Sequence, residues 1–240
     1  MAAMELRKSH ALGSLGGKPV LGKRGAIRGP REDMLMQESR AHWDCIYDSK
    51  SEGELSWYQE RPAVSLDLIH RAGTPKEAAI IDIGGGTSRL AEALLGEGFR
   101  NLAALDISEA ALIAAKRRLG PRASRVNWIA ADVTRWGPQE SFALWHDRAA
   151  FHFLIEAPDR EAYARCAIKA LRPGGHIIVG TFAPDGPQRC SGLPVMRHDA
   201  ASLSAALGGG FTLLESRRDD HLTPSGKIQK FQFSLFRREA

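Results

Sequence analysis

Residues 80–90 read Ile80-Ile81-Asp82-Ile83-Gly84-Gly85-Gly86-Thr87-Ser88-Arg89-Leu90. An apolar run ends in an acidic residue and a glycine cluster, and a segment with helical patterning follows. This order predicts a buried strand that turns tightly beneath a ligand, with a helix N-terminus beyond the turn. Glycines suit such a turn because they tolerate positive φ and leave the backbone open to close approach.

The spacing of the cluster argues against a phosphate-binding loop. A P-loop requires G-x-x-x-x-G-K-[ST], and this string does not occur in the chain. A dinucleotide fingerprint requires a third glycine where Arg89 stands, and the carboxylate of Asp82 would repel a pyrophosphate. A carboxylate there suits a cationic or amino-bearing ligand instead. The pattern Asp82-x-Gly84-x-Gly86 resembles motif I of class I S-adenosylmethionine (SAM) methyltransferases, with Ser88 in place of the third glycine.

Two further apolar segments also end in acids. Residues 101–106 end at Asp106, about 20 residues after Gly86, where nucleotide-binding βαβ units place an acid that accepts hydrogen bonds from ribose hydroxyls. Residues 126–131 are followed by Asp132, for which the methyltransferase resemblance implies a contact with the adenine amino group. Three strand-end acids separated by helix-length segments predict a SAM site. The residues expected to bind this cofactor are Trp57, Asp82, Gly84, Gly85, Gly86, Asp106, Ile107, Asp132, Val133 and His146.

The composition is that of a globular enzyme. A chain of 240 residues with 43% hydrophobic and 25% charged residues supports one domain with a substantial core. No apolar run approaches the ~18–20 residues of a membrane span, so we expect no membrane association. Three cysteines without paired spacing favour a reducing, cytoplasmic setting over a disulfide framework. Nucleic-acid methylation is disfavoured because the chain has neither an N-P-P-[YF] tetrapeptide nor a catalytic P-C dipeptide.

The first 31 residues differ from the rest. They are glycine-rich and basic and lack a regular apolar period, which predicts a disordered arm over residues 1–31. Two alternatives are a targeting segment and a start codon assigned upstream of the true one, at Met34 or Met36. Residues 32–240 are expected to form a methyltransferase domain whose helical N-terminal part, 32–75, acts as a lid.

Helical and strand patterns alternate along this domain. Helices are predicted at 32–47, 62–71, 88–97, 109–118, 159–170 and 199–206, and strands at 79–83, 102–106, 126–131, 142–147, 175–181, 211–217 and 228–237. Alternation of this kind predicts an α/β fold with a doubly wound, mostly parallel sheet of seven strands. The last two strands have no helix between them and should form an antiparallel hairpin, as in Rossmann-like class I methyltransferases.

Candidate catalytic residues lie beyond the carboxyl ends of the strands, where open α/β sheets bind ligands. Strand 142–147 leads into His146, Asp147 and His152, which are candidate bases, although His152 could equally be a packed helix residue. The long loop after 175–181 carries Cys190, which could bind a soft acceptor or simply be a small loop residue. Arg148 would form an ion pair with Asp147 or anchor an anionic substrate. No metal site is expected, because zinc-type C-x-x-C spacing is absent.

A narrower resemblance spans roughly residues 41–236. The chain resembles the thiopurine S-methyltransferase-like branch in the stretches Trp43-Asp44, Tyr47, Trp57-Tyr58-Gln59, Asp147-Arg148-Ala149 and Pro158-Asp159-Arg160-x-x-Tyr163. This implies a small-molecule acceptor, such as a thiol, sulfide or other soft nucleophile. Aromatic lids also occur in elongation-factor lysine methyltransferases, so protein lysine N-methylation is the alternative. A noncatalytic SAM-binding module is disfavoured by the intact Asp82, Gly84, Gly86 and Asp106.

Overall fold

The computed structural model describes residues 30–240. The predicted arm at 1–31 lies outside the described residues except for its last two positions, which begin helix α1 (Pro30–Ser49). Within the described residues, no helix combines the length and the apolar character needed to cross a membrane.

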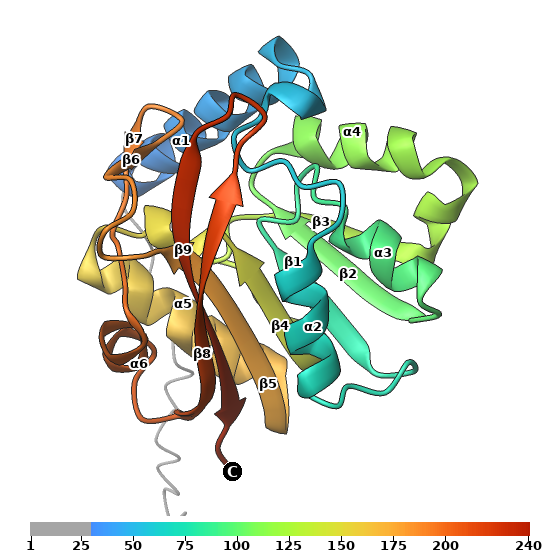
Figure 1. The fold of residues 1–240 in the computed structure, drawn as a ribbon, viewed down its shortest axis with the longest axis vertical. Helices are drawn as coiled ribbons and strands as arrows, with labels where there is room; N and C mark the ends of the chain where they lie inside the picture. Colours follow the sequence, from blue (N-terminus) through green and yellow to red (C-terminus); the bar gives the residue numbers. More distant parts are fainter. Residues whose placement is uncertain (1–29) are drawn as a thin grey trace, which may run out of the picture.

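A seven-stranded sheet with the order β3-β2-β1-β4-β5-β9-β8 forms the centre of the fold (Figure 1). The first five strands are parallel, and β9 runs antiparallel to both β5 and β8. The strands are β1 (Ala79–Ile83), β2 (Asn101–Asp106), β3 (Val126–Ala130), β4 (Phe142–Arg148), β5 (Leu171–Phe182), β8 (Phe211–Leu222) and β9 (Ile228–Arg238). This topology confirms the predicted doubly wound sheet with its antiparallel C-terminal hairpin.

Three details differ from the expected elements. β5 begins at Leu171 instead of residue 175, because Leu171 pairs with Phe142 of β4. β8 continues to Leu222 instead of ending near residue 217, because it pairs with β9 along its whole length. The loop after β5 also contains a small hairpin, β6 (Arg189–Cys190) and β7 (Leu193–Pro194). Two-residue strands are too short to produce a recognisable alternating pattern, so the sequence signal was that of an irregular loop.

Helices cover both faces of the sheet (Figure 1). One face carries α2 (Ala63–Arg71), α3 (Leu90–Gly96) and α4 (Glu109–Leu119), and the other carries α5 (Ala157–Ala170) and α6 (Ala200–Leu207). Short 3-10 turns occur at η1 (Glu52–Glu54), η2 (Gly120–Arg125) and η3 (Phe151–Phe153). Helix α1, blue at the top of Figure 1, lies across neither face and packs against α4.

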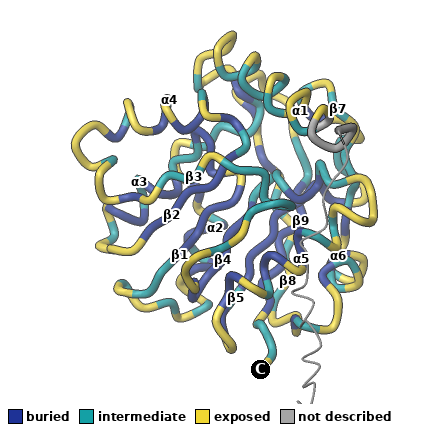
Figure 2. The backbone as a smooth tube through the Cα atoms, turned by 180° about the vertical axis from the view of Figure 1, so that it is seen from behind, coloured by how far each residue is buried: buried dark blue, intermediate teal, exposed yellow. Residues whose placement is uncertain are grey.

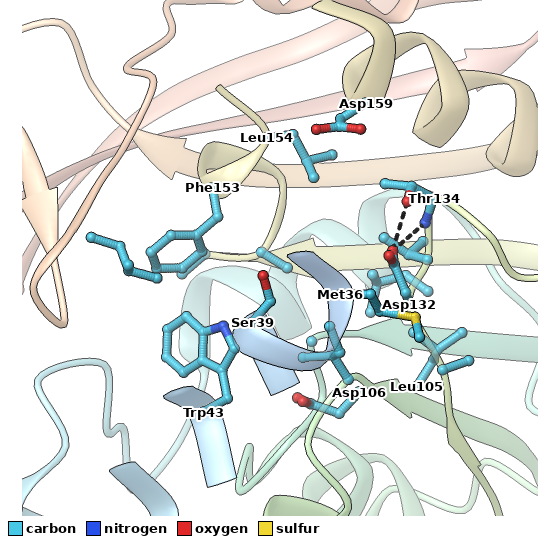
Figure 3. A pocket seen from close by; sticks show the side chains of 18 of the residues that line it. Met36, Ser39, Trp43, Leu105, Asp106, Asp132, Thr134, Phe153, Leu154 and Asp159 are labelled. Carbon is cyan, nitrogen blue, oxygen red and sulfur yellow. Dashed lines mark hydrogen bonds between the residues drawn. The ribbon is translucent and has the colours of Figure 1, made fainter. Parts of the chain in front are cut away.

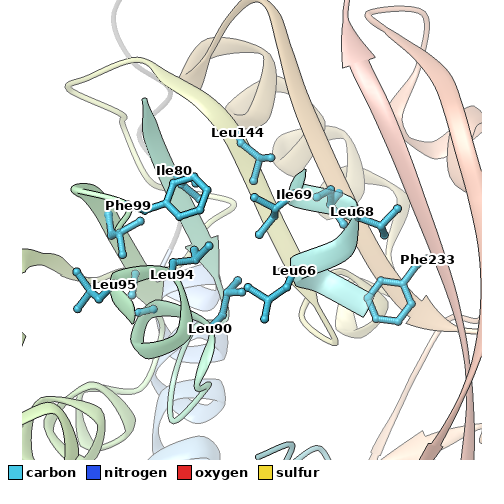
Figure 4. Close-up of a cluster of buried hydrophobic side chains, with 14 of the residues drawn as sticks. Leu66, Leu68, Ile69, Ile80, Leu90, Leu94, Leu95, Phe99, Leu144 and Phe233 are labelled. Carbon is cyan, nitrogen blue, oxygen red and sulfur yellow. The ribbon is translucent and has the colours of Figure 1, made fainter. Parts of the chain in front are cut away.

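The sheet separates two apolar clusters, and the strands are the most deeply buried part of the chain (Figure 2). On the α2 and α3 side, Leu66 and Leu90 pack with Leu144 (Figure 4). On the α5 and α6 side, Trp145 packs with Tyr163. Successive side chains of a strand point to opposite faces, so β4 sends Leu144 to one cluster and Trp145 to the other. The same alternation decides where the polar residues that follow are directed.

Candidate active site

A cavity of about 590 Å³ opens at the carboxyl ends of the parallel strands (Figure 3). It lies at the point where the sheet order reverses between β1 and β4, which is where α/β sheets of this kind bind ligands. Its walls come from the ends of β1, β2 and β4, from α1, and from the β6–β7 hairpin. The predicted residues that line it are Trp57, Gly84, Asp106, Ile107, Asp132, Val133 and Cys190.

The glycine loop after β1 forms one wall and has no room for side chains. Gly84 has φ +63°, and a Cβ placed on it would lie 2.7 Å from Cβ of Ala150. A Cβ on Gly86 would lie 2.8 Å from the hydroxyl of Tyr47. Arg118 holds the loop from outside, because its guanidinium donates to the carbonyls of Thr87 and Ser88 at 3.0 and 2.8 Å. The loop is therefore fixed in a conformation that only glycine allows.

Asp106 is a buried carboxyl at the end of β2 (Figure 3). It accepts hydrogen bonds from the backbone N–H groups of Ser108, at 2.8 Å, and Gly86. Burial raises the pKa of Asp106 to about 7, and the negative charges of Asp82 and Asp44 act in the same direction. The group is thus close to half ionised at neutral pH in the unliganded protein.

Asp132 follows β3 in a compact turn. Its Oδ1 accepts from the backbone N–H of Thr134 at 2.8 Å and from its hydroxyl at 2.7 Å, drawn as dashed lines in Figure 3. These two bonds hold the carboxylate at the cavity wall, with the apolar Ile107 and Val133 beside it. Together with Asp106, the turn gives this part of the cavity both acceptors and apolar surface.

Helix α1 lies along one side of the cavity and forms an aromatic wall there. It belongs to the N-terminal part of the domain that is predicted to act as a lid. Its lining residues Met36, Ser39, Trp43 and Tyr47 recur at helical spacing on one face. Trp43 packs edge-on against Phe153 of η3, with ring centroids 4.9 Å apart (Figure 3). Met36 and Ser39 were not predicted as site residues, although their helical spacing from Trp43 and Tyr47 could have identified them. No sequence pattern points to Phe153 as a lining residue. Met36 and the aromatic rings give this wall a largely apolar surface toward the cavity.

A carboxylate on α1 fixes the helix to the rest of the domain. Oδ1 of Asp44 accepts a 2.6 Å hydrogen bond from the hydroxyl of Ser108 and a 3.4 Å bond from the N–H of Ala110. Both donors belong to the N-terminal turn of α4, where a negative charge is favourable. Helix α1 is therefore anchored beside Asp106.

His146 lies outside the main cavity, and both of its ring nitrogens have partners. Nδ1 is 2.6 Å from Oδ1 of Asp82, and Nε2 is 2.8 Å from the hydroxyl of Ser65 on α2. The alternation along β4 directs His146 to the α2 face, where Asp82 also points. Both line a second, much smaller cavity of about 40 Å³, next to Gly84. Gly85 and Gly86, within the same loop, are buried and do not line the main cavity.

Asp147 points to the opposite face and organises the turn after β4. It accepts hydrogen bonds from the N–H groups of Ala150 and Phe151, at 3.0 and 3.1 Å, and from the hydroxyl of Tyr163 at 2.8 Å. Burial raises the pKa of Asp147 to about 6. Ala149 within this turn has φ +68°, a conformation that the bonds to Asp147 help to maintain. In this structure Asp147 supports the turn and does not face the cavity.

His152 is fully buried behind the cavity wall. Its ring lies 4.6 Å from that of Phe182, whose N–H donates to Nδ1 at 3.4 Å. Burial and the positive charge of Arg148 lower the pKa of His152 to about 3. An imidazole with this pKa stays neutral near pH 7 and is a weak base.

Cys190 does line the cavity, on the β6–β7 hairpin. Its side chain is buried, and burial raises the pKa of the thiol. The group is therefore a thiol, not a thiolate, in the unliganded protein. Cys45, Cys166 and Cys190 are all free.

Comparison with known proteins identifies the class of the domain. Residues 80–175 match the family model described as a methyltransferase domain. The chain is 27% identical over 141 residues to the eEF1A lysine and N-terminal methyltransferase of Mus musculus, covering 58% of this chain and 20% of that protein. It is 31% identical over 123 residues to trans-aconitate 2-methyltransferase of Variovorax paradoxus, covering 50% and 44%. The chain thus spans only about a fifth of the length of the eEF1A relatives.

Solved structures agree on the fold. The Burkholderia thailandensis 1,6-didemethyltoxoflavin-N1-methyltransferase, solved with S-adenosylhomocysteine, superposes with a TM-score of 0.63 at 19% identity, covering 90% of this chain and 93% of that one. The N-methyltransferase NodS of Bradyrhizobium japonicum, also with S-adenosylhomocysteine, gives 0.61 at 18% identity, covering 76% and 90%. The chain carries a class I SAM-dependent methyltransferase domain, and SAM is its cofactor. The thiopurine S-methyltransferase-like branch is not singled out by these relatives and stays a prediction.

Proposed function

We propose that this domain transfers the methyl group of SAM to a small-molecule acceptor with a soft, easily ionised nucleophile such as a thiol or sulfide. The observation that carries the proposal is the cavity at the strand ends, bordered on one side by the aromatic face of α1. Its volume of about 590 Å³ lies within the range of about 300–1,000 Å³ for small-ligand pockets, and cofactor and acceptor must share it.

The residues at the strand ends fit SAM. In the proposed arrangement Asp106 accepts hydrogen bonds from the ribose hydroxyls, Asp132 contacts the adenine amino group, and Asp82 attracts the α-amino group. Gly84 brings the backbone of the loop to the cavity wall, where the ligand can approach it closely. When bound, SAM supplies a methyl group on a positively charged sulfur.

The acceptor class is supported by the positions of the three predicted bases, none of which faces the cavity in the part of the chain that the structure describes. His146 is engaged by Asp82 and Ser65, Asp147 holds a turn, and His152 is buried behind the wall. The chain would therefore act by orienting the acceptor and excluding water. A thiol suits this arrangement, since its pKa near ~8.5 lets it lose a proton to water before it attacks.

Protein lysine methylation is the second candidate, and the eEF1A lysine and N-terminal methyltransferases among the relatives support it. A lysine has a pKa near ~10.4 and needs a base before it can attack. The positive charge of Arg148 in the cavity wall would also oppose an incoming ammonium group. These two features favour the small-molecule acceptor.

Incubation with methyl-labelled SAM tests the choice. We expect label to appear in small thiols or sulfide when these are offered alongside selenide, arsenite and cell-extract proteins. Heat-denatured protein is the control for uncatalysed transfer. Label appearing only in protein would reject the small-molecule proposal.

Lowering the pH from 8 to 6 is expected to weaken SAM binding about tenfold. With a pKa of about 7, Asp106 in the free protein passes from mostly ionised to mostly protonated over this range. Ribose hydroxyls donate most strongly to the ionised form, so protonation reduces the binding-competent population. Calorimetry at several pH values measures the change. Asp106→Asn removes the titration of this group, and an identical pH profile in this variant would contradict the assignment.

A further inference from the structure

Arg148, at the end of β4, is a part-buried cation that forms no ion pair among the described residues. Its Nη1 donates to the carbonyl of Trp57 at 2.8 Å, and its guanidinium carbon lies 4.8 Å from the ring centroid of Phe231. Its Nε and Nη2 are buried and have no hydrogen-bond partner among the described residues. The side chain lines the main cavity beside Cys190.

The nearby carboxylates do not fill this role. Asp147, the neighbour in sequence, points to the opposite face of β4 and is occupied by Tyr163 and two backbone N–H groups. Asp82 is hydrogen-bonded to His146. Asp219 on β8 attracts the guanidinium through space, but the two form no ion pair among the described residues. The predicted ion pair between Arg148 and Asp147 is therefore not formed.

Buried donors without acceptors are costly, which makes them informative. Leaving a buried donor unsatisfied costs about 1–3 kcal/mol, and more for a charged group. Burial lowers the pKa of Arg148 only to about 10, so the side chain remains charged at pH 7. Nε and Nη2 present their N–H bonds from the same edge of the guanidinium. This edge matches the two oxygens of a carboxylate in a bidentate pair.

Resting on the proposed small-molecule methyltransferase function, we propose that the acceptor carries a carboxylate that binds the guanidinium of Arg148 at the wall of the cavity, with the unpartnered Nε and Nη2 as donors. Stacking on Phe231 and the bond to the Trp57 carbonyl fix the plane of the guanidinium before the acceptor arrives. The site then selects anionic acceptors over neutral ones. Because the carboxylate of the acceptor is held at Arg148, the spacing between that carboxylate and the nucleophile within the acceptor decides where the nucleophile lies in the cavity.

Binding of benzoate to the protein loaded with S-adenosylhomocysteine tests the site without turnover. We expect Arg148→Gln to weaken benzoate binding at least tenfold by calorimetry. Arg148→Lys keeps the charge but not the paired donors, and should recover only part of the affinity. The charge control is Arg61→Gln, outside the cavity lining, whose side chain is 65% exposed and pairs with Glu97. This control should change benzoate binding less than twofold.

Several outcomes would overturn the proposal. One is an equal loss of affinity in Arg148→Gln and Arg61→Gln, which would indicate only a long-range effect of charge. Another is a benzoate affinity that does not change in Arg148→Gln, with an equal loss of thermal stability in Arg148→Gln and Asp219→Asn. That result would mean that the guanidinium stabilises the fold through its attraction to Asp219. Tighter binding of phenylphosphonate than of benzoate would reject a carboxylate in favour of a phosphoryl group.

A paired turnover assay separates this inference from the proposed function. Thiosalicylate and thiophenol differ by one carboxylate, and the wild-type enzyme should prefer thiosalicylate in kcat/KM by about tenfold. Arg148→Gln should abolish that preference while retaining SAM binding. If neither thiol is methylated but benzoate still binds through Arg148, the thiol function fails and the carboxylate site stands. Equal kcat/KM for the two thiols in the wild type would overturn the carboxylate site.

Discussion

Replacing Asp106 with alanine is expected to weaken SAM binding about 100-fold. The carboxylate lies at the cavity wall, held by the N–H groups of Ser108 and Gly86, and its free lone pairs are the acceptors proposed for the ribose hydroxyls. Hydrogen bonds to a charged group contribute about 1.5–3 kcal/mol each, so losing two of them corresponds to at least ~100-fold in affinity. Calorimetric titration with SAM and with S-adenosylhomocysteine measures the loss.

Stability provides the control for this substitution. Because the folded-state pKa of Asp106 is raised to about 7, its ionisation destabilises the fold as the pH rises from the unfolded-state value through about 7. Alanine removes that penalty but leaves the N–H groups of Ser108 and Gly86 without their acceptor. We therefore expect a melting temperature within a few degrees of wild type at pH 8. An affinity within threefold of wild type in a folded Asp106→Ala protein would contradict the ribose role.

The fold was predictable because its determinants are local. Strands such as β1 and β2 are short apolar runs ended by acids, and the intervening segments have helical periodicity. The strand-end position of Asp106 and Asp132 follows directly, since the carboxyl ends of parallel strands share one edge of the sheet. The cavity walls at Gly84, Ile107 and Val133 were found by the same reasoning.

The orientation of side chains was not predictable to the same degree. His146 and Asp147 are adjacent in sequence and near the cavity, yet they point to opposite faces of β4. His146 finds Ser65 on one face of the sheet, and Asp147 finds Tyr163 on the other. The placing of these partners depends on how α2 and α5 pack on the sheet, and such long-range packing cannot be deduced from local sequence patterns. Adjacency in sequence likewise suggested an Asp147–Arg148 ion pair, whereas neighbouring residues of a strand diverge.

Gly84→Ala is expected to lower the free energy of unfolding by about 3 kcal/mol and to reduce SAM affinity more than tenfold. A non-glycine residue at φ +63° costs ~1–2 kcal/mol, and forcing a methyl group into a packed site costs ~1–3 kcal/mol more. Gly73→Ala is a matched control, because Gly73 has the same φ of +63° but nothing within 4 Å of the position of a Cβ. It should lose only the backbone contribution, about 1–2 kcal/mol, and should bind SAM as the wild type does. Urea unfolding and calorimetry report the two quantities.

A second substitution isolates the clash. The ideal Cβ of residue 84 lies 2.7 Å from Cβ of Ala150, so Gly84→Ala combined with Ala150→Gly removes the overlap and leaves the backbone strain. Ala150 itself has φ −105° and ψ −48°, a conformation that glycine adopts at a cost of only ~0.5–1 kcal/mol. The double variant should recover SAM affinity to within about threefold of wild type while remaining less stable than it. If the SAM affinity of the double variant stays low, backbone strain at residue 84 limits binding, and contact with Ala150 does not. The requirement for glycine would then come from the backbone conformation at residue 84 alone, without a contribution from the close approach of the ends of β1 and β4.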